Sequence, residues 1–439
     1  MVVLNGARRW VGVAIGQSGT RARLIRGAVG SGAVQMAALG TSLLLAVVLA
    51  RGLGAEGYGI YAYAIALLNL LLVVAEAGVP TRLMREVAVA RAGARWASVR
   101  GDLRTGLAVI AVVALAVAVA GACVVVVVDP ALATAEARTC LLMLAVLPVV
   151  GVAKGLAYAL RGLDRVVLAQ ACEILLRPAT ALGLLAAAFW FLPQLRLPEW
   201  AMAAQLLAAA AVAALAAVWL RRCLPGGVPA PEPRALGRWL RSALPFALIG
   251  GAGVLNTQTD IIMLGWFRSD PEVGAYRIAQ QGGLLTLLVL QAAQSVLGPA
   301  FGRSYAAGDT TALRGQFRWA ARWVAAGTVP VAGVLIVFAQ PIVEAVFGPA
   351  FALAAGPLAI LAAGYLGNVA FGPVGQLLQM AGRERKTAWV LWATVGLNAG
   401  LNALLIPLYG VYGGALATAV AVVLYHAGLR AIAVRDLGV

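Results

Sequence analysis

The sequence predicts an all-α polytopic membrane protein with twelve transmembrane helices, and three observations support this fold class. First, 62% of the 439 residues are hydrophobic and only 12% are charged, whereas soluble domains carry about 45–50% apolar and about 25% charged residues. Second, the apolar residues form runs of about 20, the length of a bilayer-spanning helix. Third, the basic residues are concentrated in alternate loops. Together these features exclude a soluble enzyme, a disordered chain and a secreted disulfide scaffold.

The apolar runs place the spans in order along the chain. Six are expected near 27–49, 59–79, 105–128, 139–160, 166–190 and 200–220, and six more near 242–266, 274–298, 321–340, 353–378, 387–407 and 411–430. Residues 1–26 are expected to form a cytoplasmic N-terminal tail. The segment 221–241 holds the Pro/Gly-rich run LPGGVPAPEP and is expected to be a cytoplasmic connector. The chain then divides into an N-terminal lobe, 27–220, and a C-terminal lobe, 242–439, with a short cytoplasmic tail.

The positions of Lys and Arg predict the orientation. Of 34 such residues, 27 fall in the tails and loops on one side of the predicted spans, 4 fall on the other side and 3 lie within spans. Because basic loops stay in the cytoplasm, both termini are expected there, in a bacterial-type inner membrane. The net charge of +17 is therefore a topology signal, and nucleic acid is not an expected partner.

An internal repeat relates the two halves of the chain. At an offset of 215 residues, Gly59 pairs with Gly274 and Tyr61 with Tyr276. At an offset of 220, RGLDR (161–165) resembles AGRER (381–385). Both matches occur in the same order and at equivalent topological positions, which indicates a duplication. The sequence therefore predicts two six-helix lobes related by a pseudo-two-fold axis along the membrane normal, an arrangement known in transporters.

Residues suited to catalysis are scarce. His426 is the only histidine, and the four cysteines form no CxxC pair, so we expect no metal, no cofactor and no disulfide framework. The predicted outer loops are short, and their one D-x-E pair, Asp270 with Glu272, lies in a Ser-Asp-Pro-Glu turn typical of a helix cap. The protein is thus expected not to be an enzyme. A membrane glycosyltransferase or ligase remains the less favoured alternative.

Several segments resemble a known transporter family. LARGLGAEGYGIYAYA (49–64) and EAGVPTRLMRE (76–86) resemble the start of the polysaccharide-biosynthesis flippases, members of the multidrug/oligosaccharidyl-lipid/polysaccharide exporter superfamily. TDIIMLGW (259–266), VGAY (273–276) and NAGLNALLIPLYGVYGGALAT (398–418) extend the resemblance through the second half. The resemblance implies two six-helix lobes around a central cavity, alternating access, and translocation of lipid-linked sugars between leaflets.

Ionisable groups within spans are the first candidates for transport, because each is costly in a bilayer unless it faces a partner or a wet cavity. Glu173 and Arg177 share a face by their i, i+4 spacing, and Pro178 after them is expected to kink the helix. Arg177 is the leading candidate contact for a lipid pyrophosphate, since its fork suits phosphate. An intrahelical ion pair with Glu173 is the competing interpretation.

Asp260 closes the polar run NTQTD (256–260), which either lines a cavity or breaks the helix. Arg277 is expected at similar depth and is the natural partner of Asp260, as a coupling site or a structural ion pair. Glu76 is a second candidate coupling carboxylate or a packing residue. Asn398 and Asn402 share a face and either line the cavity or bond between helices. Further candidate substrate contacts are Lys154, Arg82, Arg85, Asn256 and Gln258.

The leading functional hypothesis is a flippase that moves a lipid-linked pyrophosphate oligosaccharide from the cytoplasmic to the outer leaflet for cell-surface polysaccharide assembly, by rocking of the two lobes. The alternative is a cation-coupled multidrug exporter of the same superfamily. Expected partners are the lipid-linked substrate, membrane lipids and a polysaccharide polymerase or glycosyltransferases, with the protein itself a monomer. The in-span charges are balanced, three basic against three acidic, so they do not by themselves identify an anionic substrate.

Overall fold

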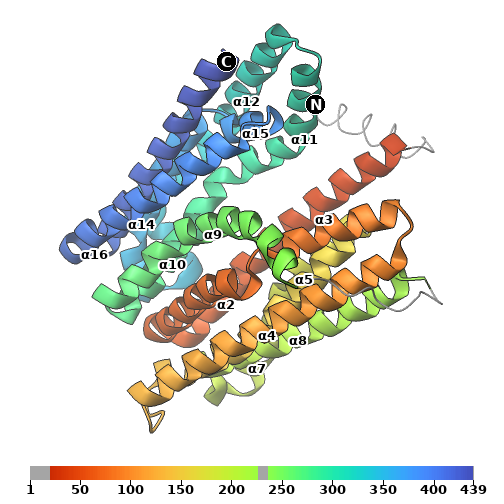
Figure 1. Ribbon diagram of the computed structural model, residues 1–439. Coiled ribbons are helices and arrows are strands. Elements are labelled where there is room, and N and C mark those ends of the chain that lie inside the picture. The colour runs from red at the N-terminus through yellow and green to blue at the C-terminus, as the bar shows by residue number, and fades with distance from the viewer. Residues whose placement is uncertain (1–19, 226–235, 439) are drawn as a thin grey trace.

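The computed structural model describes residues 20–225 and 236–438, and every regular element within these ranges is a helix. Much of the tail expected over 1–26 and the middle of the connector expected over 221–241 lie outside the described residues. The helices form two bundles that meet at one end and diverge toward the other (Figure 1). The chain is therefore an all-α, multi-pass membrane protein with two lobes, as predicted.

The N-terminal lobe contains the helices that precede the connector. They are α2 (Thr20–Glu76), α3 (Val79–Ala92), α4 (Trp96–Val128), α5 (Ala135–Gly162), α6 (Val166–Gln170), the π-helical turn η1 (Ala171–Leu176), α7 (Arg177–Phe191), the short 3-10 turn η2 (Pro193–Leu195) and α8 (Pro198–Cys223).

The C-terminal lobe follows the same plan with more interruptions. Its elements are α9 (Leu236–Phe267), α10 (Asp270–Leu284), η3 (Leu285–Leu287), α11 (Leu288–Ala306), α12 (Thr310–Val337), α13 (Ala339–Phe347), η4 (Pro349–Ala354), α14 (Ala355–Ala370), α15 (Val374–Met380) and α16 (Glu384–Leu437).

The two longest helices, α2 and α16, each contain two arms. Their backbones break at Gly54 (φ 72°) and Gly410 (φ 57°), conformations that glycine adopts without steric cost. A straight helix would separate Ser42 from Ile65 by about 34 Å, yet both line one cavity, so the arms of α2 fold back on each other. Eight described helices are long and apolar enough to span a membrane. Two of these helices, α2 and α16, have two arms and so account for two crossings each. Helix α9 and the interrupted run α10–η3–α11 complete the twelve predicted crossings.

Two predicted segments differ from the structure. The segment 80–104, which lies between the expected spans 59–79 and 105–128, is largely helical, because Leu83, Val87 and Ala90 are spaced to bury one face of α3 against the lobe. The expected span 353–378 is interrupted at Gly372, whose φ of +69° ends α14 before α15 begins. Apolar length alone therefore identified neither the amphipathic helix α3 nor the break at Gly372.

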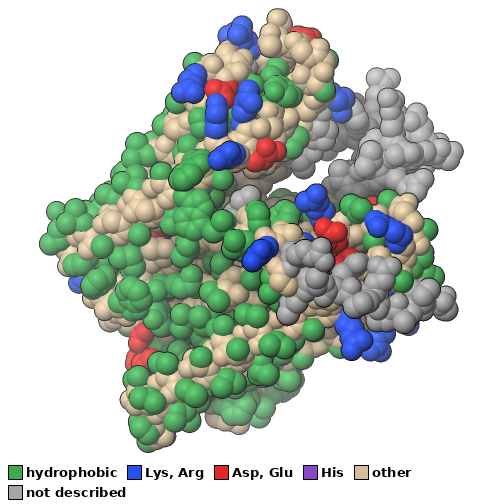
Figure 2. Space-filling model, viewed as in Figure 1, with side chains coloured by type: hydrophobic (Ala, Val, Ile, Leu, Met, Phe, Trp, Pro, Cys, Tyr) green, Lys and Arg blue, Asp and Glu red, His purple; other side chains and the backbone are tan. Residues whose placement is uncertain are grey.

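The lobes touch along α2 and α10 and leave a hollow between them at the other end. Figure 2 shows this hollow at the end where Lys and Arg side chains gather, while the remaining visible surface is mostly apolar. At the closed end, Arg51 donates to the carbonyls of Ala345 and Val346 across the interface, at 2.5 and 2.8 Å. Helix α9 contacts both lobes, since Ala243 packs on Val79 of α3. The structure is therefore open toward its basic end.

Candidate functional site

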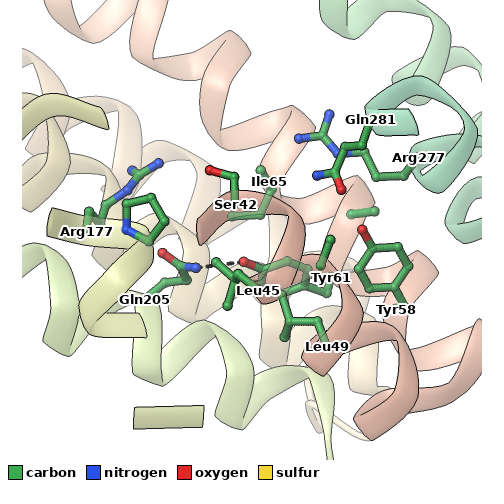
Figure 3. Close-up of a pocket in the computed structure, with 13 residues that line it drawn as sticks. Ser42, Leu45, Leu49, Tyr58, Tyr61, Ile65, Arg177, Gln205, Arg277 and Gln281 are labelled. Atoms are coloured by element: carbon green, nitrogen blue, oxygen red, sulfur yellow. Dashed lines mark hydrogen bonds between the residues drawn. The ribbon is translucent and has the colours of Figure 1, made fainter. Parts of the chain in front are cut away.

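A cavity of about 190 Å³ lies between the lobes, near the point where they meet. Its polar lining includes arginines from both lobes, Arg177 at the start of α7 and Arg277 on α10, on opposite sides of the cavity (Figure 3). The lining residues of the N-terminal lobe are Ser42, Leu45, Ala46, Leu49, Tyr58, Tyr61, Ala62, Ile65, Arg177, Pro178 and Gln205, and those of the C-terminal lobe are Arg277 and Gln281. None of these residues is acidic, so the cavity suits an anion.

Arg177 follows a local break in helix geometry. The six-residue π-turn η1 directly precedes it, and Pro178 cannot donate the next helical hydrogen bond. Such π-turns occur frequently at functional sites. The competing interpretation, an ion pair between Glu173 and Arg177, is wrong: Glu173 instead accepts a hydrogen bond from Arg161 of α5 at 2.6 Å. Among the described residues Arg177 makes no hydrogen bond or ion pair, and its guanidinium is left to face the cavity.

Arg277 does not bind Asp260, and the predicted partnership is wrong. Its Nη1 donates to Oε1 of Gln280 at 2.9 Å, and its side chain lines the central cavity beside Gln281 (Figure 3). Sequence depth placed Asp260 and Arg277 at one level of the membrane, but depth does not say which face of a helix a residue occupies. The two residues belong to different clusters, since Asp260 bonds to buried neutral side chains and Arg277 lines the central cavity.

Asp260 is fully buried and accepts four hydrogen bonds from neutral side chains. Oδ1 accepts from Asn398 and Asn402, at 2.9 and 2.7 Å, and Oδ2 accepts from Tyr276, at 2.9 Å, and from Thr418. Because Asn402 and Thr418 bind one carboxylate, the arms of α16 fold back on each other about Gly410. Of the two interpretations of the asparagines, bonding between helices is the correct one.

The second acidic residue, Glu76, is paired. Its Oε2 lies 2.7 Å from Nζ of Lys154 on α5, while its Oε1 is buried without a partner among the described residues. Lys154 also lines a second cavity, of about 230 Å³, inside the N-terminal lobe. Glu173 and Arg177 line this cavity too. Arg177 therefore lies between the central cavity and the inner one.

Four other predicted contacts lie away from the central cavity. Arg82 is buried on α3 and lines a separate polar cavity with Glu86 and Arg95, and Arg85 is exposed nearby. Asn256 and Gln258 lie within α9, which is continuous through the NTQTD run, so the alternative of a broken helix is wrong. Neither residue is among those that line the central cavity.

Sequence reasoning missed Tyr58, Gln205 and Gln281, which line the central cavity, and also Gln280 and Thr418, which bond to Arg277 and Asp260. Gln205 donates to Oη of Tyr61 at 2.8 Å (Figure 3), and Oε1 of Gln281 is buried without a partner in the described part of the chain. The internal repeat was one sequence signal for polar contacts in this region. It pairs Tyr61 with Tyr276, and both hydroxyls make buried hydrogen bonds within their own lobes.

The charges within the spans are therefore not balanced at the central cavity. The acids are all engaged elsewhere: Glu76 with Lys154, Glu173 with Arg161, and Asp260 with neutral donors. Two guanidiniums remain, one from each lobe, on the central cavity. Guanidinium forks bind phosphate oxygens in pairs, so a phosphate or diphosphate between the arginines would contact both lobes at once.

Comparison with known sequences matches two families. The family described as "Polysaccharide biosynthesis protein" matches residues 24–305, and the family described as "MatE" matches residues 253–404. The probable low-salt glycan biosynthesis flippase Agl15 of Haloferax volcanii is 25% identical over 167 residues, which cover 38% of this chain. The matched region spans only 35% of that relative's length.

Two solved structures share the fold over nearly the whole chain. An inward-facing multidrug resistance MATE family transporter of the MOP superfamily matches with a TM-score of 0.71, at 14% identity, over 91% of this chain and 95% of that one. The lipid II flippase MurJ, in an inward closed conformation, matches with a TM-score of 0.68, at 13% identity, over 91% of this chain and 86% of that one.

Proposed function

This chain belongs to the polysaccharide biosynthesis protein family of the multidrug/oligosaccharidyl-lipid/polysaccharide exporter superfamily, and from that membership we propose that it is a flippase for a lipid-linked oligosaccharide. The observation that carries the proposal is the central cavity with Arg177 and Arg277 from opposite lobes and no acidic lining residue. The diphosphate of the substrate binds between the two guanidiniums while its lipid tail stays in the bilayer.

The rest of the cavity supports a sugar beside the diphosphate. Buried Oε1 of Gln281 has no donor among the described residues, and a sugar hydroxyl supplies one. Tyr58 and Tyr61 add aromatic side chains to the lining of the cavity. Lys154 and Arg82 lie outside this cavity and assist in attracting the anionic headgroup rather than in holding it.

The decisive experiment measures flipping of a defined lipid-linked oligosaccharide in proteoliposomes. Arg177→Ala and Arg277→Ala are each expected to lower the flipping rate at least tenfold, since a hydrogen bond to a charged group contributes about 1.5–3 kcal/mol. Arg318→Ala, which removes an exposed arginine of α12, is the matched control and should flip normally. Export of drugs without lipid flipping would instead establish the multidrug alternative.

Ion coupling is proposed for Asp260, because its carboxylate is fully buried and its hydrogen bonds come from the neutral side chains of Tyr276, Asn398, Asn402 and Thr418, with no basic partner among the described residues. A buried carboxylate without a cationic partner is suited to take up a proton or a hard cation. Flipping is then expected to respond to an imposed Na⁺ or H⁺ gradient, and Asp260→Asn should abolish the response. A response that survives in Asp260→Asn but disappears in Glu76→Gln would move the coupling site to the N-terminal lobe.

We propose transport without catalysis, in the inner membrane and with both termini in the cytoplasm. The D-x-E pair supports this, because Glu272 completes a capping box with Ser269 at the start of α10. Asp270→Asn with Glu272→Gln should therefore leave flipping intact, and a loss of function in this variant would favour the glycosyltransferase or ligase alternative. A polymerase or glycosyltransferase is the natural neighbour that consumes or supplies the lipid-linked glycan.

A further inference from the structure

Gln280 makes two hydrogen bonds that tie Arg277 to a neighbouring helix. The side chain is only 7% exposed and does not line the central cavity. Its Nε2 donates to the backbone carbonyl of Thr257 on α9 at 3.0 Å, and its Oε1 accepts from Nη1 of Arg277 at 2.9 Å. A backbone carbonyl only accepts hydrogen bonds, so the amide nitrogen must face Thr257. The amide oxygen is thereby fixed toward Arg277.

The two arginines of the cavity consequently differ in how firmly their side chains are held. Arg277 is held by a buried amide that is itself anchored to a helix backbone. Arg177 has no hydrogen bond to a described residue and follows the π-turn η1. A side chain held in its binding geometry loses little conformational entropy when a ligand arrives, whereas a free one loses more. Arg277 is therefore the preformed half of the anion site, and Arg177 is the half that must be recruited.

We propose that Gln280 is a positioning residue that presents Arg277, the preformed half of the anion site, to a lipid diphosphate that also contacts Arg177 of the N-terminal lobe. The inference rests on the proposed flippase function and assigns a positioning residue to the same site. Gln280 acts only through Arg277, since its own side chain does not reach the cavity.

The test measures binding of farnesyl diphosphate to the full chain in detergent by isothermal titration calorimetry, with farnesol as the uncharged control ligand. Gln280→Met keeps the volume of the side chain and removes both hydrogen bonds. It is expected to weaken farnesyl diphosphate binding about fivefold, the effect of one lost hydrogen bond, and to leave farnesol binding unchanged. Gln340→Met, an exposed glutamine of α13, is the matched control and should bind as the parent does.

A double-mutant cycle distinguishes positioning from a general structural effect. In an Arg277→Met background, Gln280→Met should cause no further loss of affinity. An equal loss in both backgrounds, or no loss in either, would overturn the proposal. If Gln280→Met does not fold, Gln280→Glu replaces it. The new carboxylate keeps the contact with Arg277 but neutralises it, and binding should weaken at least tenfold; unchanged binding would again overturn the proposal.

Two further outcomes separate this inference from the proposed function. If the parent protein binds farnesyl diphosphate no better than farnesol, the anion site itself fails, and the inference fails with it. If the parent binds the diphosphate but Gln280 variants are unaffected, only the positioning role fails. Inorganic pyrophosphate is the last ligand to be titrated. If the parent protein binds it more weakly than farnesyl diphosphate, the result supports a lipid-linked ligand, and equal affinity for the two overturns that assignment.

Discussion

Gly59 and Gly274, which the internal repeat pairs, lie against each other where the two lobes meet. A Cβ on Gly274 would lie 3.1 Å from the backbone nitrogen of Gly59 and 2.8 Å from the carbonyl oxygen of Ala55. Equivalent residues of a duplicated chain can touch only near the axis that relates the two copies. The glycines therefore mark the pseudo-two-fold axis at the closed end of the molecule, and their lack of side chains lets α2 and α10 approach closely.

We predict that Gly59→Ala weakens this closed end. The new Cβ would lie 1.8 Å from the carbonyl oxygen of Asp270, so the helices must separate, at a cost of about 1–3 kcal/mol. Spin labels at Ala133→Cys and Ala350→Cys, one in each lobe, should report longer distances by electron resonance. Gly183→Ala adds a methyl group to an open site on α7 and should leave the distances unchanged. Equal distances in all three proteins would contradict the role of Gly59 in closure.

The ion pair of Glu76 and Lys154 is predicted to stabilise the N-terminal lobe. Lys154→Met leaves the buried carboxylate without its partner, and breaking such a pair costs about 3–5 kcal/mol. Lys154 is one-third exposed, so we expect the lower end of that range. Adding Glu76→Gln should restore most of the thermal stability, because no charge is then left unpaired. Failure of the second change to restore stability would show that Lys154 acts through packing alone.

Helix α9 is predicted to bend when the lobes rock. Ala243 packs on the N-terminal lobe and Asp260 bonds within the C-terminal lobe, while Gly250 and Gly253 lie between them in open space. Alanine at each glycine should stabilise the protein by about 0.5–1 kcal/mol, because helical glycine loses more backbone entropy, and should slow flipping.

Gly237→Ala provides the control for α9. It makes the same change at an open site near the beginning of the helix and should add stability without slowing flipping. If Gly250→Ala and Gly253→Ala flip at the same rate as Gly237→Ala, α9 does not bend at these glycines.

Asp436 joins the two ends of α16, and its contribution to stability is predicted to depend on pH. The hydrogen bond from Lys386, and the nearby Arg383 and Arg435, hold the pKa of Asp436 below its usual value of 3.8. A carboxyl group with a lowered folded-state pKa stabilises the protein above the unfolded-state value, and this stability is lost as pH falls through the folded-state pKa. Asp436→Asn should therefore unfold at a lower temperature than the parent at pH 7, and the difference should disappear at the most acidic pH. A constant difference across the titration would exclude the ionised carboxylate as the cause.

Much of the fold could be predicted from the sequence because membrane spans are read from local properties. Apolar length and the distribution of Arg predicted the crossings, and the repeat predicted a pair of lobes. The departures lie where apolar length is not the deciding property. The positive φ of Gly372 interrupts a predicted span, and an apolar stripe makes an amphipathic helix, α3, of part of the segment 80–104 between two predicted spans.

Less of the candidate site than of the fold could be predicted from the sequence. The sequence by itself determined that Arg177, Arg277, Glu76, Glu173, Lys154 and Asp260 are placed in the membrane, where each must find a partner or a wet cavity. Only the tertiary structure decided which partner each one has. Asp260 binds four neutral donors, Glu173 binds Arg161, and the two arginines face one cavity from opposite lobes. The physical reason is that burial along the membrane normal follows from a local run of residues, whereas pairing across helices depends on how each helix is rotated and folded back at Gly54 and Gly410.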